Sequence, residues 1–231
     1  MRPQTTIQQR RSDLNDMSST HVRLLPLVAC LAVVCALSAC ATPGEPIPTS
    51  EPATSEPVTS TPAPIRQTDD RGKPLPFTTR FPDRWSANNN GTSYEPCTAL
   101  NDAELTSLGL NPTTVRDVAL ANHQTARGCI WKYFGKSMGG ISQSTGNRPT
   151  FEYELTDREW YIRSYTTTIG GRLAIVNYWK QFSCFTIVKV ENARVTTTAN
   201  RVLTPTPEAE LCNLAIEFTK LTIPKMPPPA P

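Results

Sequence analysis

The chain has almost no excess of charge of either sign. Its 231 residues include 23 Lys and Arg against 20 Asp and Glu, a formal net charge of +3. Four arginines and two aspartates lie in the first 39 residues, so the remainder carries 19 basic and 18 acidic side chains. Binding to nucleic acid depends largely on neutralising phosphates with a basic surface. We therefore expect no nucleic-acid partner.

A long hydrophobic run is also missing: the longest, LLPLVACLAVVCALSA at residues 24–39, has only 16 residues. That is short for a bilayer-spanning helix and typical of the apolar part of a signal peptide. Arg23 precedes it, and Leu37-Ser38-Ala39-Cys40 ends it. This tetrapeptide resembles the bacterial lipobox, in which the cysteine thiol is diacylated and the peptide is cut on the N-terminal side of that cysteine. We expect residues 1–39 to be a lipoprotein signal peptide and Cys40 to carry a lipid anchor in the membrane.

Two details of this signal stay open. Met17 begins a signal of ordinary length, so we expect it to be the true start, because export does not need residues 1–16. Arg10-Arg11 resembles a twin-arginine export signal, but Asp13 stands where that motif usually has an apolar residue. General secretory export is the expectation and twin-arginine export the alternative.

Large apolar side chains are scarce from residue 40 to residue 76, where proline, threonine and serine dominate and TSEP occurs twice. Such a segment cannot bury a core. Proline at this density favours an extended, semi-rigid chain. We expect a disordered tether between the lipid anchor and a folded domain at residues 77–224, with O-glycosylation of the threonines as a further possibility. Residues 225–231 are expected to be a proline-rich tail.

Histidine is nearly absent, which limits the chemistry. Only His123 remains once the signal peptide, with His21, is removed. No GxSxG motif accompanies it, and sites for transition metals usually use several His or Cys ligands. The glycine pairs Gly139-Gly140 and Gly170-Gly171 lack the surroundings of a phosphate-binding loop. We expect no catalytic residue, metal or cofactor.

Seven cysteines become four after export, because two leave with the signal peptide and Cys40 is lipidated. The other four are Cys97, Cys129, Cys184 and Cys212. An even number outside the cytoplasm predicts two disulfides, for which three pairings are possible. We favour Cys97 with Cys129 and Cys184 with Cys212, because each pair would join a helical segment to a strand. A zinc site is disfavoured because no two are spaced as CxxC.

The folded part is predicted to be an α+β domain, an antiparallel sheet covered by helices. Asn101 and Glu104 form a capping-box pattern for a helix at residues 102–108, and Thr206 with Pro207 predicts a helix that Pro224 ends. A less regular helix is predicted at residues 112–122, and a Gly/Ser-rich loop at 135–148. Alternation of apolar and polar residues predicts strands at residues 129–134, 151–155, 160–169, 173–179, 184–190 and 194–198.

Several short segments carry a resemblance to a known family. They are PCTAL at residues 96–100, LNDAELTSLGL at 100–110, GCIW at 128–131, GRLA at 171–174 before Cys184, and LTIP at 221–224 after Cys212. In this pattern, over residues 94–224, the chain resembles the DUF3558 family, lipoproteins of actinobacteria including mycobacteria. Many relatives have Asp before Pro-Cys, where this chain has Glu95. The resemblance implies an exported, membrane-anchored envelope protein and implies no activity.

Two functions follow as expectations. The first is a non-enzymatic envelope lipoprotein on the outer face of the cytoplasmic membrane, which binds an envelope lipid, a glycan or a protein. Aromatic residues on the predicted strands could line a ligand surface, although core packing explains most of them equally well, and Arg172 could orient its turn or meet an anion. The alternative is an enzyme, or enzyme accessory, acting on envelope polymers through Glu152 and Glu154.

Overall fold

The computed structural model describes residues 63–135, 138–202 and 206–231. The predicted signal peptide, the lipidated Cys40 and the tether as far as residue 62 lie outside these residues. In the described part, no helix combines the length and the apolar character needed to cross a bilayer.

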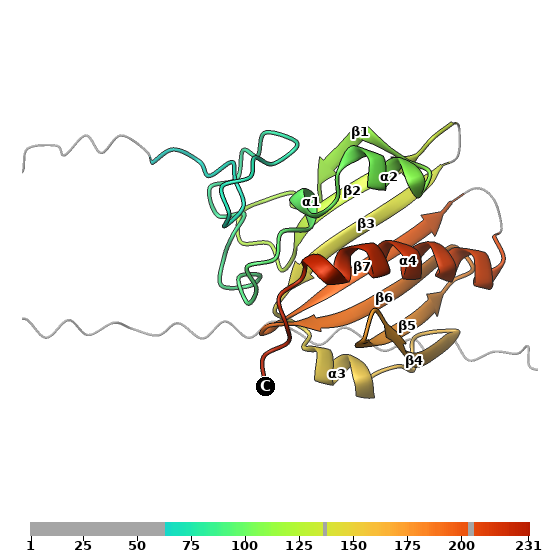
Figure 1. Ribbon diagram of the computed structural model, residues 1–231. Coiled ribbons are helices and arrows are strands. Elements are labelled where there is room, and N and C mark those ends of the chain that lie inside the picture. Colours follow the sequence, from blue (N-terminus) through green and yellow to red (C-terminus); the bar gives the residue numbers. More distant parts are fainter. Residues whose placement is uncertain (1–62, 136–137, 203–205) are drawn as a thin grey trace, which may run out of the picture. The chain divides into compact units, whose positions relative to one another are not determined.

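The core of the fold is one antiparallel sheet of seven strands in the order β1-β2-β3-β7-β6-β5-β4. Figure 1 shows β1 at the top of the sheet and β4 at the bottom, so that these two strands form its edges. The strands are β1 Leu110–Asp117, β2 Arg127–Tyr133, β3 Gly139–Gly146, β4 Arg163–Ile169, β5 Arg172–Trp179, β6 Ser183–Val190 and β7 Ala193–Arg201.

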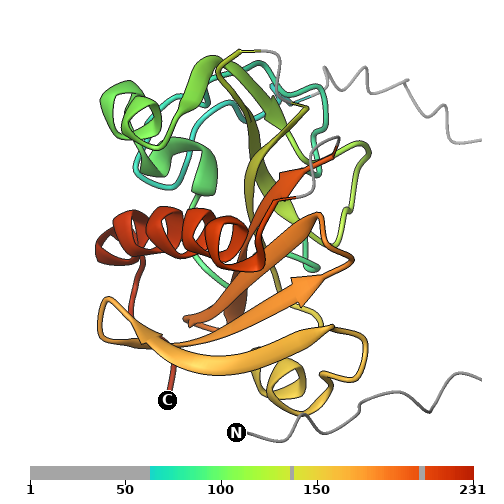
Figure 2. The same ribbon diagram turned by 90° about the vertical axis from the view of Figure 1, so that its right-hand side faces the viewer.

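The helices lie on both faces of the sheet, and most of them on one (Figure 2). The long helix α4 packs against β6 and β7, and α2 against β1. On the opposite face α3 packs against Ile175 and Ile187. The helices are α1 Pro96–Ala99, α2 Asp102–Ser107, α3 Phe151–Thr156 and α4 Glu208–Thr222, followed by a 3-10 turn Ile223–Lys225. The α+β class with an antiparallel sheet is confirmed.

Helix α4 covers the largest part of the hydrophobic core. Its fully buried Leu211, Ala215 and Phe218 recur at helical spacing, as the sequence predicts, and the Phe218 ring lies 5.6 Å from the ring of Trp131 on β2. The helix begins at Glu208 with Pro207 at its cap position, one residue later than predicted. Pro224 lies in the 3-10 turn that ends it.

Four threonine hydroxyl groups and the side-chain amide of Gln143 form a second, polar contact between α4 and the sheet, which we call the hydroxyl seam (Thr186, Thr197, Gln143, Thr219 and Thr222). Thr219 of α4 donates to Thr197 Oγ1 at 2.8 Å and bonds to Thr186. Gln143 Nε2 donates to Thr197 and Thr222, at 2.9 Å each. All five side chains are buried, and each finds a polar partner, as buried polar groups require.

Both favoured disulfides are present, Cys97 with Cys129 and Cys184 with Cys212. The first joins α1 to β2, and the second joins β6 to α4. Each therefore fixes a helix to the sheet, which is the arrangement that the sequence analysis favoured.

Three predicted elements are wrong. Residues 112–122 are not helical: the first part belongs to β1, where Thr and Val favour a strand and Pro112 is tolerated at a sheet edge. The expected loop at 135–148 contains β3, which pairs with β2 and β7. The glycines of β3 allow the backbone of the neighbouring strand to come close, since a Cβ on Gly140 would lie 1.9 Å from the carbonyl oxygen of Trp131.

The third wrong prediction concerns residues 151–155, which form helix α3 rather than a strand. Thr150 caps the helix by accepting a hydrogen bond from the Tyr153 amide. Phe151 and Leu155, four residues apart, share the helix face that packs on Ile175 and Ile187. The alternation that suggested a strand is also compatible with an i, i+4 pair on a short helix.

The folded domain extends beyond both predicted boundaries. Before residue 77, Thr68 and Pro74 form a β-bridge and Leu75 is buried against the main core. The expected tail is also held: Met226 is buried, and Glu191 accepts from the Ala230 amide. Residues 63–76 and 225–231 are therefore part of the domain.

Leu75→Ala should lower the free energy of unfolding by about 2–3 kcal/mol, because it removes a buried side chain from the core. The matched control is Leu120→Ala, whose side chain is 79% exposed and whose loss should cost less than about 0.5 kcal/mol. Urea denaturation followed by circular dichroism measures both. Equal effects of the two substitutions would show that residues before 77 do not belong to the core.

Candidate functional site

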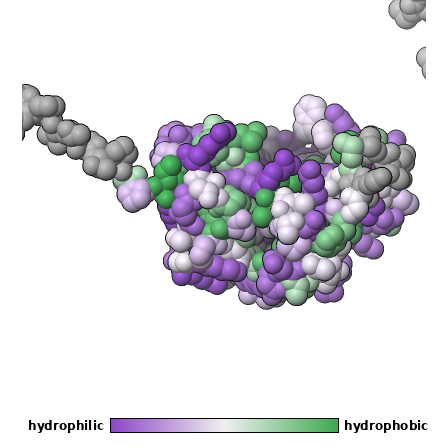
Figure 3. Space-filling view, turned by 90° about the horizontal axis from the view of Figure 1, so that it is seen from above, coloured by the Kyte–Doolittle hydropathy of each residue, from purple (hydrophilic) through white to green (hydrophobic). Residues whose placement is uncertain are grey.

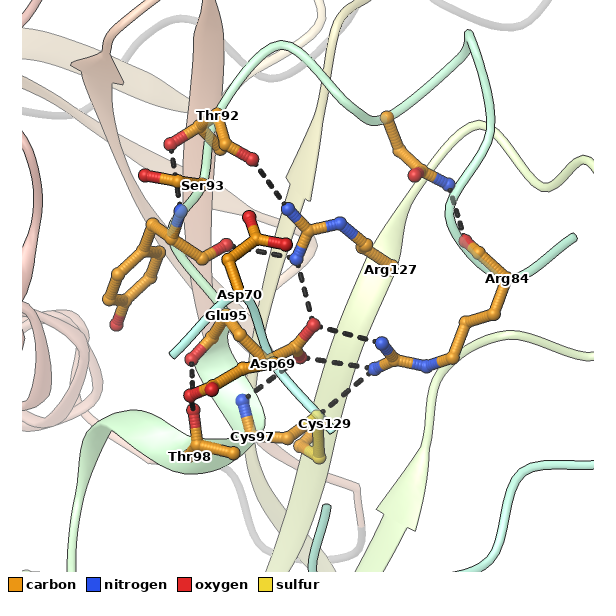
Figure 4. A network of polar contacts seen from close by, with 12 residues as sticks. Asp69, Asp70, Arg84, Thr92, Ser93, Glu95, Cys97, Thr98, Arg127 and Cys129 are labelled. Carbon is orange, nitrogen blue, oxygen red and sulfur yellow. Dashed lines mark hydrogen bonds and ion pairs between the residues drawn. A yellow bond between two sulfur atoms is a disulfide. The ribbon is translucent and has the colours of Figure 1, made fainter. Parts of the chain in front are cut away.

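A buried carboxylate, Glu95, lies between two buried arginines just before α1 (Figure 4). Arg84 donates to both of its oxygens, at 2.9 and 3.1 Å. Arg127, at the start of β2, donates to Oε2 at 2.8 Å and to the carbonyl oxygens of Tyr94 and Thr92. We call Arg84, Glu95, Asp117 and Arg127 the ion network.

The ion network is electrically balanced, which allows its burial. Arg84 Nε donates to Asp117 at 2.8 Å, and its guanidinium stacks 4.6 Å from the Trp85 ring. Burial opposes the charge of Arg84, but the carboxylates of Glu95 and Asp117 outweigh it and raise the pKa of Arg84. Burial lowers the pKa of Arg127 in spite of Glu95. The network joins the segment before α1 to β1 and β2.

Next to Glu95 lies a cavity of about 510 Å³, which we call the α1 cavity. Three parts of the chain form its walls: the bridged turn at residues 68–74, the segment with α1, and the turn after α4. The lining residues are Asp69, Arg71, Lys73, Ser93, Tyr94, Glu95, Thr98, Ala99, Pro224, Lys225, Met226 and Pro227.

The carboxylates around the α1 cavity are already engaged by the protein. Glu95 belongs to the ion network. Burial alone would raise the pKa of Asp69, but the Thr98 hydroxyl at 2.7 Å and the amides of Lys73 and Arg71 keep it below its usual value. Of the cations, Lys73 donates to the Thr98 carbonyl oxygen. The exposed guanidinium of Arg71 has no hydrogen-bond partner within the described residues.

The wall after α4 is fixed from two sides. Arg172 donates to the carbonyl oxygens of Met226 and Pro227, at 2.7 and 2.8 Å. Lys225 pairs with Glu104 of α2 at 2.6 Å, and this contact lowers the pKa of Glu104. Arg172 was predicted either to bind carbonyl groups of its own turn or to meet an anion. It does bind carbonyl groups, but these belong to the C-terminal segment and not to its own turn.

A family model with the description "Protein of unknown function (DUF3558)" matches residues 35–225. The chain belongs to the DUF3558 family. Searches among curated proteins and among solved structures found no match. Three of the segments that carry the resemblance meet at the α1 cavity of this DUF3558 domain: α1 and Pro224 line it, and Arg172 holds its C-terminal wall.

The structure does not assemble the carboxylates suggested for catalysis. Glu152 and Glu154 lie on α3 of the DUF3558 domain, and each faces its own cation: Glu152 pairs with Lys189 at 2.9 Å and Glu154 with Arg194 at 3.3 Å. Contact with Lys189 lowers the pKa of Glu152, whereas burial raises the pKa of Glu154. His123, as expected, lies in a loop, where it is exposed near Asp83.

The aromatic residues do not form one common surface. Trp131, Tyr133 and Tyr178 belong to the core beneath α4, and Phe151 to the core beneath α3. Trp160 and Tyr153 are exposed. Core packing, the simpler of the two interpretations, therefore accounts for the most buried members. Among the described residues no group of His, Cys, Asp and Glu could hold a metal ion.

Three charged residues of the site, Arg127, Asp69 and Arg71, were not predicted from the sequence. The sequence does offer a sign that Arg127 is buried and paired, because it stands beside Gly128 and Cys129 in a strand that is otherwise mostly apolar. Asp69 and Arg71 were assigned to the tether because prolines surround them. The run Asp69-Asp70-Arg71-Gly72 nevertheless has the composition of a tight turn, and Asp69 accepts hydrogen bonds from the amides of that turn.

Glu95→Gln should lower the free energy of unfolding by roughly 3–5 kcal/mol, because it leaves two buried guanidinium groups without their shared carboxylate. Glu217→Gln is the control: it breaks an exposed pair with Lys220 and should cost less than about 1 kcal/mol. Thermal and urea unfolding at neutral pH measure both variants. A small effect at Glu95 would mean that the ion network does not stabilise the domain.

Proposed function

We propose that this protein is an exported lipoprotein of the cell envelope, of the type found in actinobacteria, anchored by diacylated Cys40 to the outer face of the cytoplasmic membrane. The basic flank, the 16-residue apolar run and the lipobox at residues 37–40 support this proposal. So does the family match, which begins at residue 35 and thus includes the lipobox. Two disulfides are consistent with an oxidising compartment.

We further propose that the domain is a non-enzymatic binding module and that the α1 cavity takes an anionic ligand. One observation carries this proposal. Three of the segments that carry the family resemblance meet at this cavity, and the carboxylates of the cavity already accept hydrogen bonds from the protein itself. Of the positive groups around it, Lys73 donates to the Thr98 carbonyl oxygen and Lys225 pairs with Glu104, so that among the described residues Arg71 is the one without a partner. Small-molecule sites have this form, a concave pocket with a few polar groups that fix orientation.

Catalysis on envelope polymers is the weaker candidate. It depended on two carboxylates acting together, and α3 turns them toward different cations. The α1 cavity contains Asp69 and Glu95, but both already accept several hydrogen bonds. A general acid or base needs a proton that can be exchanged with the substrate, so binding describes this site better.

Cys40→Ser should release the protein from the membrane without unfolding it, because the acyl chains can no longer be attached. Fractionation of cells that express the full chain, followed by immunoblotting, measures the distribution. The control is Ser38→Thr, which changes the lipobox but keeps its cysteine, and this variant should remain in the membrane fraction. Membrane retention of the Cys40→Ser variant would contradict the proposed anchor.

Arg71→Glu should weaken binding of an anionic ligand by at least about tenfold, because it reverses the unpaired positive charge at the cavity. The probe is soluble short-chain phosphatidylglycerol, titrated into the full chain and followed by native mass spectrometry, which also reports any ligand that co-purifies. Arg116→Glu, the same change on an exposed residue of β1, should bind as the unmodified protein does. Absence of any bound anion would overturn the proposed ligand class.

A further inference from the structure

The two edges of the sheet differ in how they are protected. Edge strands expose unpaired backbone groups, and proteins commonly block them with proline, bulges or charges. Strand β1 has all three: Pro112, a shift of register between Asn111 and Arg116, and the charges of Arg116 and Asp117. Figure 3 views the molecule from the β1 side and shows hydrophilic and hydrophobic residues in small alternating patches.

Strand β4, the other edge, has none of these devices over most of its length. It pairs with β5 without interruption from Arg163 to Ile169, and within the described part of the chain no strand lies on its outer side. Residues 164–169, SYTTTI, contain neither proline nor charge. The one charged side chain, Arg163, is paired with Glu208 of α4 at 3.3 Å. Tyr165, Thr166 and Thr168 are exposed.

Exposed apolar side chains gather near this strand. Among the described residues eleven large hydrophobic side chains are exposed, and six of them lie between residues 160 and 182. Trp160 and Ile162, 76% and 63% exposed, directly precede β4 in the chain, and Leu173 lies opposite Thr168. Exposed apolar side chains thus lie at both ends of β4, Trp160 and Ile162 before its first residue and Leu173 beside its last ones.

The sequence of β4 is compatible with pairing to itself. In an antiparallel pair with a twofold axis through Thr166, Tyr165 faces Thr167, Ser164 faces Thr168 and Arg163 faces Ile169. No like charges are opposed, and threonines facing threonine or serine across antiparallel strands are favourable partners. A groove of about 390 Å³ between β4 and α4, lined by Tyr165 and Ile216 among others, adjoins the same edge.

We propose that two copies of this protein associate through antiparallel pairing of their β4 strands about a twofold axis at Thr166. One sheet then continues through both copies, with both α4 helices on the same face. The interface is isologous, as in most homodimers. Its central residue, Thr166, does not line the α1 cavity, and the pairing does not depend on the ligand proposed there. Only the end of β4, at Ile169, packs against Tyr94 and Met226 of that cavity.

The test uses the full chain with Cys40→Ser, so that neither acyl group nor detergent contributes to association. Analytical ultracentrifugation and native mass spectrometry should show a concentration-dependent dimer. Thr166→Lys and Thr166→Glu should each weaken it by at least about tenfold, because like charges then face each other. An equimolar mixture of these two variants should recover a dimer that contains one copy of each.

The matched control is Thr113→Lys, which adds the same charge to an exposed position of the β1 edge and should leave the dimer unchanged. Circular dichroism checks that each variant remains folded. A monomer at the highest soluble concentration would overturn the proposal, and so would a dimer that Thr166→Lys leaves intact. Recovery of the mixed dimer supports it specifically, because only a twofold axis near residue 166 brings the two substitutions together.

Discussion

The arrangement of the N-terminal part of the domain depends on one buried charge, the carboxylate of Glu95. It binds Arg84 from a segment without regular structure and Arg127 from β2. Because Glu95 directly precedes Pro96 and Cys97, the ion network and the Cys97–Cys129 disulfide act on the same short helix. Coulombic and covalent contacts thereby hold the same short segment, in addition to the burial of Tyr94, Cys97 and Leu100.

The two sides of the domain are stabilised in different ways. The side with the α1 cavity is assembled from residues distant in the sequence, such as Asp69, Glu95 and Met226, which side-chain hydrogen bonds hold together. The side with β4 consists of consecutive strands joined by regular backbone pairing. Irregular backbone that encloses a cavity suits a ligand site, whereas a regular open edge suits another strand.

The sequence predicted those elements whose signals are local. The Asn101 capping box, the apolar face of α4 and the strands around Val176 and Val188 are all present. Predictions failed where distant partners decide the conformation: the Gly/Ser-rich residues of β3 form a strand because β2 and β7 lie on either side of them. The α1 cavity was missed for the same reason, since its walls meet only in the folded chain. Both disulfides could be predicted because the cysteines are even in number and because each favoured pair joins a predicted helical segment to a predicted strand.

The hydroxyl seam beneath α4 restricts how that helix can sit. Leucine, alanine and phenylalanine would tolerate a helix rotated or shifted along the sheet, because apolar contacts have little directionality. Thr219 and Thr222 must instead meet Thr197 and Gln143, or leave buried polar groups without partners. The seam and the Cys184–Cys212 disulfide therefore restrict α4 to the same position on the sheet, the first through directional polar contacts at one part of the helix and the second through a covalent bond at another.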